Sequence, residues 1–517
     1  MFCSSKKEAA VFSEKFNERG YLTVSLSGED SQEKRENAIE KLVADEGEKL
    51  DYIFTVDIFN EGVDIPEINQ VVMLRPTESP IVFVQQLGRG LRKADDKEYV
   101  VILDFIGNYK NNFMIPIALS GDKSYDKDII RRYVREGSRI IPGNSTIHFD
   151  EISKERIFRS IDGIKGIKKI IKNSYEQLKG RLGRVPNLMD FYNNGEVDPL
   201  IILKEYKTYY HFLQNAEKQF AVKKISDDEL LVLEYLSKTI ASGKRPHELE
   251  ILKRVIEDGN FDVDEIARTI EKEYNIEGAD EGVEAAISVL QGSFVTNENE
   301  KKKFSQIDII TKSSTRRYER MKSFYNRIQE KDFNQYLDDI IELGIARYNN
   351  IYKDKINGVF ALYEKYSRRD VCHLLNAEKD LSSTMYGMKK IGDDVSIFVT
   401  YHKEESLDES EYLQGKPDYA DEFVQGSEEL FRWDSQIGRG IKSSYIDEVC
   451  NTKRKHLFIK KSDAEGADFY YMGQFDVFDM REDYKKDNTG RMREITKLVL
   501  KLQNPVRPDL LDYLTQN

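Results

Sequence analysis

The sequence predicts a multidomain chain of three parts: an α/β lobe with a parallel sheet at residues 1–115, a mostly α-helical coupling region at 116–349, and an α+β domain with a barrel-like sheet at 350–517. Three observations support this fold class. Short apolar runs alternate with amphipathic stretches in the first part, long charged segments with helical spacing fill the second, and strand-like patterns return in the third. A chain of 517 residues is long enough for several domains.

The first part begins with elements that alternate between helix and strand. Apolar residues recur on one stripe of Glu8–Arg19 and of Gln32–Val43, which predicts two amphipathic helices. Short apolar runs predict strands that are buried on both faces of a sheet. These expected strands are Tyr21–Leu26, Tyr52–Val56, Gln70–Leu74 and Tyr99–Phe105. Because helices separate the strands, the sheet should be parallel.

The second and third parts differ in their periodicity. In the second part, helices are expected at Asp227–Ile240 and His247–Ile256, and Ser226 followed by Glu229 predicts a helix start with a capping box. In the third part, two helices should precede the strands. The expected helices are Tyr352–Tyr366 and Arg368–Leu375, and the expected strands are Val395–Tyr401, His456–Ile459, Phe469–Met472 and Ile495–Leu502.

The composition argues against several classes of protein. No apolar run approaches the roughly 18 residues of a membrane span, and the N-terminus lacks the apolar core of a signal peptide. The three cysteines, Cys3, Cys372 and Cys450, are too far apart for a disulfide framework or a metal site. We therefore expect a cytoplasmic protein with no membrane partner and no bound metal of its own. A net charge of −13 does not attract nucleic acid, so DNA contact would need a local basic patch such as Ile437–Lys461.

A Gln-x-x-Gly-Arg-x-x-Arg motif carries the strongest chemical signal. Arg89 and Arg92 are three residues apart, which places both on one face of a helix. Phosphoryl transfer from ATP needs cations at fixed positions beside the γ-phosphate, and the planar guanidinium group binds phosphate oxygens in pairs. Gln85 lies one turn earlier on the same face, and Gly88 allows a neighbouring lobe to approach closely. The motif predicts a nucleotide contact.

A second segment, Thr55–Pro66, runs from the end of an expected strand into a loop. Gly62 gives this loop conformational freedom, and Asp64 is suited to bind a ribose hydroxyl or to contact the arginines. Thr55 is suited to contact a nucleic-acid phosphate. For either segment alone, a surface arginine pair or an ordinary turn is an adequate explanation. Both segments in this order, after alternating strands and helices, favour the functional interpretation.

Residues 1 to about 110 resemble the second RecA-like lobe of superfamily-two DEAD/DEAH-type helicases, in which these two segments are called motifs V and VI. The resemblance implies that Arg89 and Arg92 are arginine fingers, and that Gln85, Gly88, Gly62 and Asp64 lie at the nucleotide. It also implies that the strand ends at Ser4 and Ser27, together with Thr55, face nucleic acid. Gly62 lies one residue later than the family pattern places it.

The chain departs from this family in one large respect. It contains neither the Gly-x-x-x-x-Gly-Lys-Ser/Thr motif that holds phosphates nor an acidic Asp-Glu box for magnesium. ATP and Mg²⁺ are therefore expected only when the first helicase lobe is supplied by another polypeptide. The chain is expected to be a split or truncated half-site that is inactive alone.

The third part also resembles a known group. Ser367–Asn376, Phe431–Gln436 and Phe469–Gly473 resemble an uncharacterised domain at the end of bacterial helicases that often begin with a phospholipase-D-type nuclease. Some of those helicases resemble ATP-dependent type IV restriction enzymes that cut DNA carrying modified cytosine. The resemblance implies an SRA-like barrel that reads the modified base. The nuclease motif itself, His-x-Lys-x4-Asp, does not occur in the sequence.

The residues of the third part suit the recognition of a base that is flipped out of the duplex. Such a base needs an aromatic slot and a few polar groups, with cations for the flanking phosphates. Trp433, the one tryptophan, is the expected stacking surface, with Tyr386 and Tyr401 as further walls. The expected polar and basic contacts are Asp434, Ser435, Gln436, Arg439, Lys453 and Arg454. The alternative is that Trp433 is a core residue whose polar neighbours cap strands.

These observations lead to one hypothesis and two alternatives. The hypothesis is the C-terminal portion of an ATP-dependent DNA helicase or translocase in a modification-dependent restriction or phage-defence enzyme. Its partners would be single- or double-stranded DNA and the N-terminal lobe and nuclease part. The alternatives are a non-catalytic DNA-binding or assembly subunit and a fragment of a repair helicase. The basic segment around Gly180–Pro186 is either a helix-turn-helix-like DNA clamp or part of a coupling bundle.

Overall fold

The computed structural model describes most of the chain, which divides into two compact units, Met1–Ile167 and Lys168–Asn517. The described residues are 1–44, 47–56, 58, 65–75, 83, 97–105, 112, 114–120, 122–136, 147–162, 167–195, 197–220, 224–304, 306–353, 359–402, 421–462, 466–487 and 489–515.

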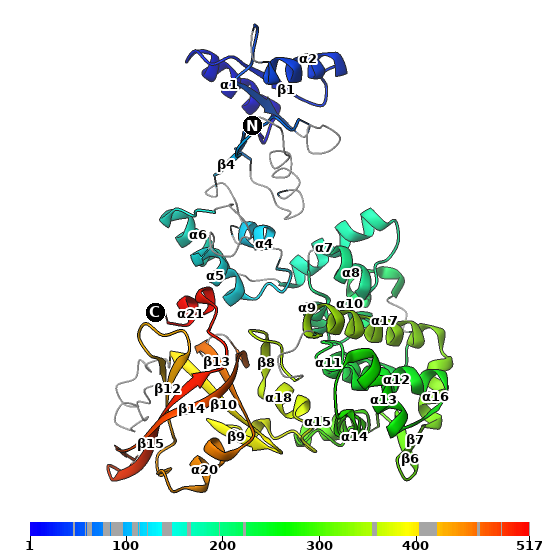
Figure 1. Ribbon diagram of the computed structural model, residues 1–517. Helices are drawn as coiled ribbons and strands as arrows, with labels where there is room; N and C mark the ends of the chain where they lie inside the picture. The colour runs from blue at the N-terminus through cyan, green and yellow to red at the C-terminus, as the bar shows by residue number, and fades with distance from the viewer. Residues whose placement is uncertain are drawn as a thin grey trace. The chain divides into compact units, whose positions relative to one another are not determined.

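The first unit contains a parallel sheet, as the sequence predicted (Figure 1). Strand β1 (Thr23–Leu26) pairs with β2 (Tyr52–Thr55), and β3 (Gln70–Met73) pairs with β4 (Val101–Asp104), each pair in parallel. Phe2 joins the two pairs, because it forms parallel bridges to both Thr55 and Met73. The first residues of the chain therefore form a short strand between β2 and β3.

Two amphipathic helices cover opposite faces of this sheet. Helix α1 (Lys6–Asn17) packs against Cys3 and Phe54, whereas α2 (Gln32–Val43) belongs to a cluster with Leu26 and Ile53. Phe54 and Ile53 point to opposite faces because side chains alternate along a strand. The predicted helices and strands are thus confirmed to within a few residues at each end.

Strand β4 differs from the expectation of a strand buried on both faces. Val101 and Leu103 lie on the same face of β4, two residues apart, and both are exposed, so no described residue covers this face. β4 also lies at one end of the described strand order, with β3 as its one described neighbour. Among the described residues of this unit, three further helices follow β4. They are α4 (Met114–Ser120), α5 (Lys127–Glu136) and α6 (Glu151–Asp162).

The second unit begins with a helical region, which confirms the prediction that the middle part of the chain is mostly α-helical. The Ser226–Glu229 capping box starts a helix, as expected. The α-helices are α7 (Ile167–Leu182), α8 (Leu188–Asn194), α9 (Pro199–Tyr206), α10 (Tyr209–Ala216), α11 (Asp227–Thr239), α12 (His247–Glu257), α13 (Val263–Tyr274), α14 (Ala279–Leu290), α15 (Glu298–Lys303), α16 (Lys322–Gln329) and α17 (Lys331–Arg347). A small antiparallel sheet, which the sequence did not indicate, consists of β5 (Asn260–Asp262), β7 (Arg317–Arg320) and β6 (Ile310–Ser314).

The C-terminal part of this unit contains a mixed eight-stranded sheet of order β11-β12-β15-β14-β13-β10-β9, with β8 paired to β14. Within the described residues the ends of this order do not pair, so the expected barrel closure is not seen. The elements are β8 (Lys365–Ser367), α18 (Arg368–Leu374), β9 (Met388–Ile391), β10 (Asp394–His402), β11 (Glu422–Phe423), β12 (Leu430–Asp434), α20 (Ser444–Asn451), β13 (Arg454–Ser462), β14 (Asp468–Lys486), β15 (Met492–Leu502) and α21 (Pro508–Thr515).

The expected helix Tyr352–Tyr366 is wrong in its described second half. Phe360 forms an isolated bridge and Tyr366 lies in β8, which pairs with β14. Both rings are fully buried, and Phe360 contacts Phe458 edge-to-face at 5.2 Å between centroids. The burial of these aromatic rings against the sheet favours the extended backbone over the helical spacing.

The C-terminal sheet buries a core on each face. One face carries Val395, Leu457 and Met472, which pack with residues of α20 and α21. The other face carries an aromatic layer that includes Phe398, Phe458 and Tyr471. Alternation along β10 and β13 explains how one strand serves both layers.

A buried ion cluster ties the C-terminal sheet to the helical region. Glu248 in α12 is paired with Arg245, and its Oε1 lies 2.6 Å from Nε2 of His373 in α18. Arg245 also donates to the carbonyl oxygen of His373 at 2.7 Å. Lys244 pairs with Asp370, which like His373 lies in α18, at 2.6 Å. Burial alone would raise the pKa of Glu248, but Arg245 and His373 outweigh it and hold that pKa well below its usual range.

We predict that Glu248→Ala lowers the free energy of unfolding of the second unit by about 3 kcal/mol, since it leaves Arg245 buried without its carboxylate. Urea unfolding followed by circular dichroism measures the change. Glu257→Ala, at an exposed position of the same helix, is the control and should stay within about 0.5 kcal/mol of the unaltered chain. Equal stability of the two variants would contradict the prediction.

Candidate nucleic-acid interface

The predicted motor residues fall into two groups. Ser4, Ser27 and Thr55 are described by the structure. The arginine fingers and nucleotide contacts expected from the sequence lie outside the described residues; these are Gln85, Gly88, Arg89, Arg92, Gly62 and Asp64. The candidate site in the first unit is therefore built from the strand ends alone.

The three described motor residues lie at one edge of the parallel sheet. Thr55 ends β2 and is level with Leu26, the last residue of β1, and with Phe2. Ser27 follows Leu26 directly, and Ser4 follows Phe2 by two residues. Carboxyl ends of parallel strands form the usual ligand-binding edge of an open α/β sheet. The structure thus brings Ser4, Ser27 and Thr55 to that edge.

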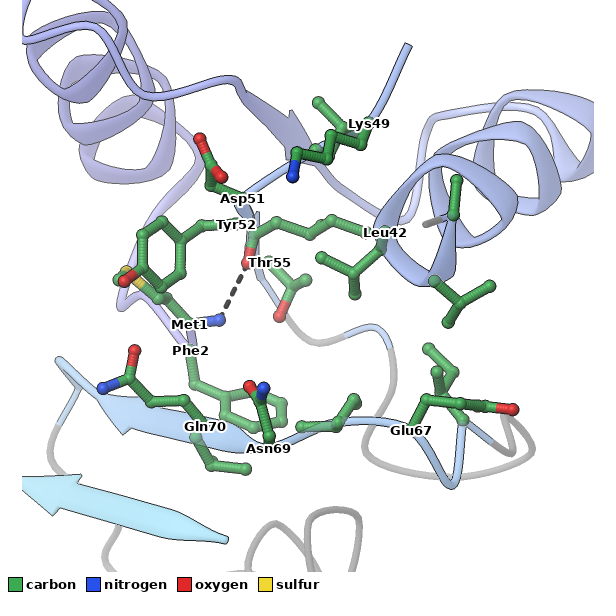
Figure 2. Close-up of a pocket in the computed structure, with 17 residues that line it drawn as sticks. Met1, Phe2, Leu42, Lys49, Asp51, Tyr52, Thr55, Glu67, Asn69 and Gln70 are labelled. Atoms are coloured by element: carbon green, nitrogen blue, oxygen red, sulfur yellow. Dashed lines mark hydrogen bonds between the residues drawn. The ribbon is translucent and has the colours of Figure 1, made fainter. Parts of the chain in front are cut away.

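Local hydrogen bonds fix these strand ends. The main-chain N–H of Ser4 donates to Glu8 at 2.7 Å, and the N–H of Ser27 donates to Asp30 at 2.7 Å. Ser4 is exposed and Ser27 is half-buried, so both are accessible from solvent. Thr55 is different, because it is only 3% exposed and lines a pocket that is partly open to solvent (Figure 2). Its hydroxyl does not lie at the surface in this conformation.

In the C-terminal sheet, the segment that was expected to read DNA is mostly buried. Trp433 is 3% exposed and belongs to the core under α20 and α21, which is the alternative that the sequence left open. The carboxylate of Asp434 accepts a hydrogen bond from Lys485 at 2.9 Å. Ser435 is fully buried, and its hydroxyl donates to the carbonyl oxygen of Arg439 at 2.8 Å. These contacts stabilise the end of β12.

The exposed part of the predicted set lies beside Tyr386. Gln436 donates through Nε2 to the carbonyl oxygen of Tyr386 at 2.9 Å, while the Tyr386 side chain is 67% exposed. Gly387 has a φ of +75°, and a Cβ atom there would lie 3.2 Å from both Gln436 and the Tyr445 hydroxyl. The Tyr386 loop and the loop after β12 are therefore packed together.

Two cations of this region lie over aromatic rings. The Arg439 guanidinium lies 5.3 Å from the centroid of Tyr445, and Tyr445 stacks on Trp433 at 6.2 Å with an interplanar angle of 18°. The Arg368 guanidinium lies 5.9 Å from the Tyr386 ring and also contacts the ring of Phe469. We call Tyr386, Gln436, Arg439 and the exposed Lys442 the Tyr386 face.

The two remaining predicted cations lie elsewhere. Lys453 precedes β13, and Arg454 begins it. Arg454 is level with Asp394 and forms two hydrogen bonds to its carboxylate, of 2.7 and 2.6 Å. Asp394 also accepts from His456 at 2.8 Å. Tyr401, expected as a wall, packs against the core instead. The structure therefore separates these residues from the Tyr386 face, leaving Lys453 exposed.

Two residues of this region were missed by sequence reasoning. Arg368 begins α18, and Tyr445 lies in α20, so neither is near Tyr386 or Trp433 in the sequence. Their contacts depend on how β-strands and loops pack in space. Arg368 lies in the Ser367–Asn376 segment and Tyr445 in the Ile437–Lys461 patch, but nothing in either segment marks these contacts in advance.

Comparison with protein-family models divides the chain into three matched segments. Residues 1–94 match the helicase conserved C-terminal domain, which agrees with the resemblance of the first lobe. Residues 171–352 and 360–514 match two domains of unknown function, DUF8090 and DUF3427. The chain thus carries a helicase C-terminal domain followed by two uncharacterised domains.

Two curated relatives match a short part of the chain. "Putative ATP-dependent helicase IRC3" of Saccharomyces cerevisiae is 34% identical over 111 residues, which cover 22% of this chain and 16% of that protein. Pre-mRNA-splicing ATP-dependent RNA helicase prp28 of Schizosaccharomyces pombe is 30% identical over 89 residues, covering 17% of this chain and 13% of that protein. The chain spans less than a quarter of the length of these relatives.

Two solved structures show a weak overall likeness. The sulfur-binding and SRA domains of ScoMcrA complexed with phosphorothioated DNA align with a TM-score of 0.21 and 11% identity, over 52% of this chain and 89% of that chain. The type ISP restriction-modification enzyme LlaBIII bound to DNA aligns with a TM-score of 0.21 and 16% identity, over 68% and 21%. Likeness at this level does not define a shared fold.

In the part of the chain that the structure describes, no helix is long and apolar enough to cross a membrane. Nor do three or more His, Cys, Asp or Glu side chains come together as metal ligands within those described ranges.

We predict that Trp433→Ala destabilises the C-terminal domain by roughly 3–5 kcal/mol, because it opens a cavity in the core. Tyr386→Ala, which removes an exposed ring, should change stability by less than about 0.5 kcal/mol. Urea unfolding followed by far-ultraviolet circular dichroism measures both variants. A Trp433→Ala chain as stable as the original would show that the ring is not a core residue.

Proposed function

We propose that the chain is the C-terminal portion of an ATP-dependent DNA helicase or translocase that belongs to a modification-dependent restriction or phage-defence enzyme. The observation that carries this proposal is the helicase C-terminal match over residues 1–94, which contains both motifs. The convergence of three strand ends at one sheet edge supports it. The restriction or defence role rests on the resemblance of the third part.

In this proposal, the first lobe contributes cations to a nucleotide that another lobe holds. Arg89 and Arg92 would contact the γ-phosphate, where charge develops during transfer. The same nucleotide would also be contacted by Gln85, Gly88, Gly62 and Asp64. ATP and Mg²⁺ would be bound chiefly by the other lobe, because the phosphate-binding motif is not in this sequence.

The proposed DNA contacts use two surfaces. Ser4 and Ser27 offer hydroxyl and main-chain groups at the sheet edge, which suit the backbone of a single strand. The Tyr386 face combines an exposed ring with Arg439 and Lys442, and such a combination stacks a base and holds the flanking phosphates. The proposed target is DNA with modified cytosine.

The buried residues of the predicted reader have a positioning role in this proposal. Trp433 supports Tyr445, and Tyr445 supports the Arg439 guanidinium. Ser435 holds the carbonyl oxygen of Arg439 at 2.8 Å. Trp433, Asp434 and Ser435 would therefore affect DNA binding through the loop they hold.

A DNA-binding assembly subunit without ATP turnover is the competing function. The lack of a Gly-x-x-x-x-Gly-Lys motif in the sequence favours it. The two functions differ in a measurable way, because only the motor function needs Arg89 and Arg92.

We expect ATP hydrolysis when the chain is mixed with the N-terminal part of a bacterial helicase that ends in the same DUF3427 domain, with single-stranded DNA present. Arg89→Ala should lower kcat about 10³-fold, since an arginine finger stabilises the charge of the transition state. Arg89→Lys should not restore the rate, because lysine lacks the planar fork. Phosphate release measures the rate.

The matched control is Lys93→Ala, which removes a cation just outside the motif and should change kcat by less than about twofold. Hydrolysis that is unaffected by Arg89→Ala would refute the arginine-finger role. Failure of every such mixture to hydrolyse ATP, with DNA binding intact, would favour the assembly subunit.

We expect the full chain to bind a duplex with a central 5-methylcytosine more tightly than the unmodified duplex. Tyr386→Ala should weaken this binding about tenfold, because base stacking on an aromatic ring contributes roughly 1–3 kcal/mol. Arg439→Ala should reduce the slope of log affinity against log salt by about one. Fluorescence anisotropy at several salt concentrations measures both effects.

Phe478→Ala is the control, since Phe478 is 64% exposed and also aromatic but lies on β14. It should change affinity by less than about twofold. Equal losses in the two aromatic variants would remove the Tyr386 face from the interface. Equal binding of modified and unmodified duplex by the unaltered chain would remove the proposed target.

A further inference from the structure

The end of β14 and the start of β15 form a two-stranded ribbon that continues beyond the neighbouring strands of the C-terminal sheet (Figure 1). β12 pairs with β15 only as far as Lys497, and β13 pairs with β14 no further than Gln474. We call residues 482–487 and 489–496 the ribbon. Its ladder runs from the Glu482–Thr496 pair to the Lys486–Met492 pair, which spans about 14 Å at roughly 3.4 Å per residue. Within the described residues, no third strand pairs with these positions.

A tight turn fixes the end of the ribbon. The carboxylate of Asp487 accepts hydrogen bonds from the N–H groups of Thr489 at 2.8 Å and Arg491 at 3.0 Å. The N–H of Asp487 donates to the carbonyl oxygen of Arg491 at 2.8 Å, and Gly490 has a φ of +81°, which favours glycine. Hydrogen bonds from the Thr489 hydroxyl and from Arg491 hold the pKa of Asp487 below its usual range. The acid of the turn is therefore engaged within the turn itself.

The end of the ribbon is basic. The residues from 484 to 493 carry four cations against one acid. Two of the cations are paired: Lys485 lies 2.9 Å from Asp434, and Arg493 lies 3.1 Å from the acid of the turn. The other two, Lys486 and Arg491, are exposed, and neither forms an ion pair with a described residue. Both are therefore available to an anionic ligand.

Apolar surface lies beside these cations. Opposite residues of an antiparallel pair share a face, so Tyr484, Lys486 and Met492 lie on the same face of the ribbon. Tyr484 is 50% exposed and Met492 is 56% exposed. Glu482 shares this face nearer to the sheet, where its carboxylate accepts from the Tyr484 hydroxyl at 2.9 Å. The outer part of the face thus combines a ring, a thioether and cations.

The same face of the ribbon adjoins the Tyr386 face. The carbonyl oxygen of Glu494 accepts from the N–H of Gly438 at 2.8 Å, and the Thr496 hydroxyl donates to the carbonyl oxygen of Arg439 at 2.9 Å. A Cβ atom at Gly440 would collide with the Glu494 carboxylate. The loop that carries Arg439 therefore packs directly on the base of the ribbon. A duplex held at the Tyr386 face would meet the ribbon next.

The shape of the ribbon fits one groove of duplex DNA. The major groove is about 12 Å wide and about 8.5 Å deep and admits a two-stranded ribbon, whereas the minor groove is only about 6 Å wide. A ladder of about 14 Å is long enough to reach the floor of the major groove. The deep, narrow major groove of duplex RNA does not admit such an element. Charge and shape together favour DNA over RNA or a protein partner.

We propose that the ribbon enters the major groove of duplex DNA, with Lys486 and Arg491 on the phosphates that border the groove and with Tyr484 and Met492 against base edges. This inference rests on the proposed binding of DNA, but not on the modified base or on ATP. The ribbon would contribute equally to modified and unmodified duplexes, because it lies apart from the Tyr386 ring that stacks on the flipped base.

The test is fluorescence anisotropy of the full chain with a short duplex, with and without a central 5-methylcytosine, at several salt concentrations. The double variant Lys486→Ala with Arg491→Ala should lower the affinity for both duplexes at least about tenfold. It should also reduce the slope of log affinity against log salt by about two. The ratio of the two affinities should not change. Lys486→Arg with Arg491→Lys keeps both charges and should keep the slope.

The groove is tested with altered probes. Guanine N7 lies in the major groove, so methylation of N7 in the duplex should weaken binding of the unaltered chain about tenfold. The double alanine variant should lose less than about twofold from the same methylation, because its ribbon no longer holds the groove. Distamycin, which fills the minor groove, should not compete. Lys322→Ala, at an exposed position of α16, is the control and should change affinity by less than about twofold.

Three results would overturn the inference. They are equal affinity losses in the Lys322→Ala chain and the double alanine variant, competition by distamycin without an effect of N7 methylation, and no duplex binding by the unaltered chain. Failure of the proposed target gives a different result. In that case the unaltered chain would bind modified and unmodified duplexes equally, and the double alanine variant would weaken both, which supports the ribbon.

Discussion

The first lobe depends on the main-chain hydrogen bonds of three residues, Met1–Cys3, which hold β2 against β3. Without this strand the described sheet would consist of two separate pairs, β1 with β2 and β3 with β4. A two-stranded sheet is at best marginally stable by itself. The same short strand leads directly into α1 and sets the level at which Ser4, Ser27 and Thr55 meet. One set of backbone bonds therefore determines both the stability of the lobe and its functional edge.

In the second unit, helix α18 contacts both the buried charges of the helical region and the exposed Tyr386 ring. Asp370 and His373 on this short helix pair with Lys244 and Glu248 of the helical region. Arg368, at the start of the same helix, contacts the Tyr386 ring. A shift of α18 would therefore disturb buried charges and the exposed ring together. Because charges cannot be moved out of such pairs at low cost, the helical region and the Tyr386 face are coupled through one helix.

Local pattern was sufficient to predict the regular elements. The parallel sheet, the capping box at Ser226 and the strands β10, β13, β14 and β15 of the C-terminal sheet followed from periodicity and composition, which act over a few residues. The shorter strands β8, β9, β11 and β12 did not. The burial of Trp433 and the extended backbone at Tyr366 did not, since both result from packing between distant segments. Aromatic type alone does not tell a core ring from a stacking surface. Only the fold shows that Tyr386 is exposed and Trp433 is not.

The net charge of the chain constrains how the Tyr386 face would work. At −13 the whole molecule repels DNA at long range, but salt limits that field to roughly 8 Å at physiological ionic strength. Arg439 and Lys442 are exposed cations of this face. Long-range attraction would contribute little to DNA binding, so direct contacts must supply most of the affinity. The exposed Tyr386 ring, whose centroid lies 5.9 Å from the Arg368 guanidinium, can supply such a contact by stacking on a base.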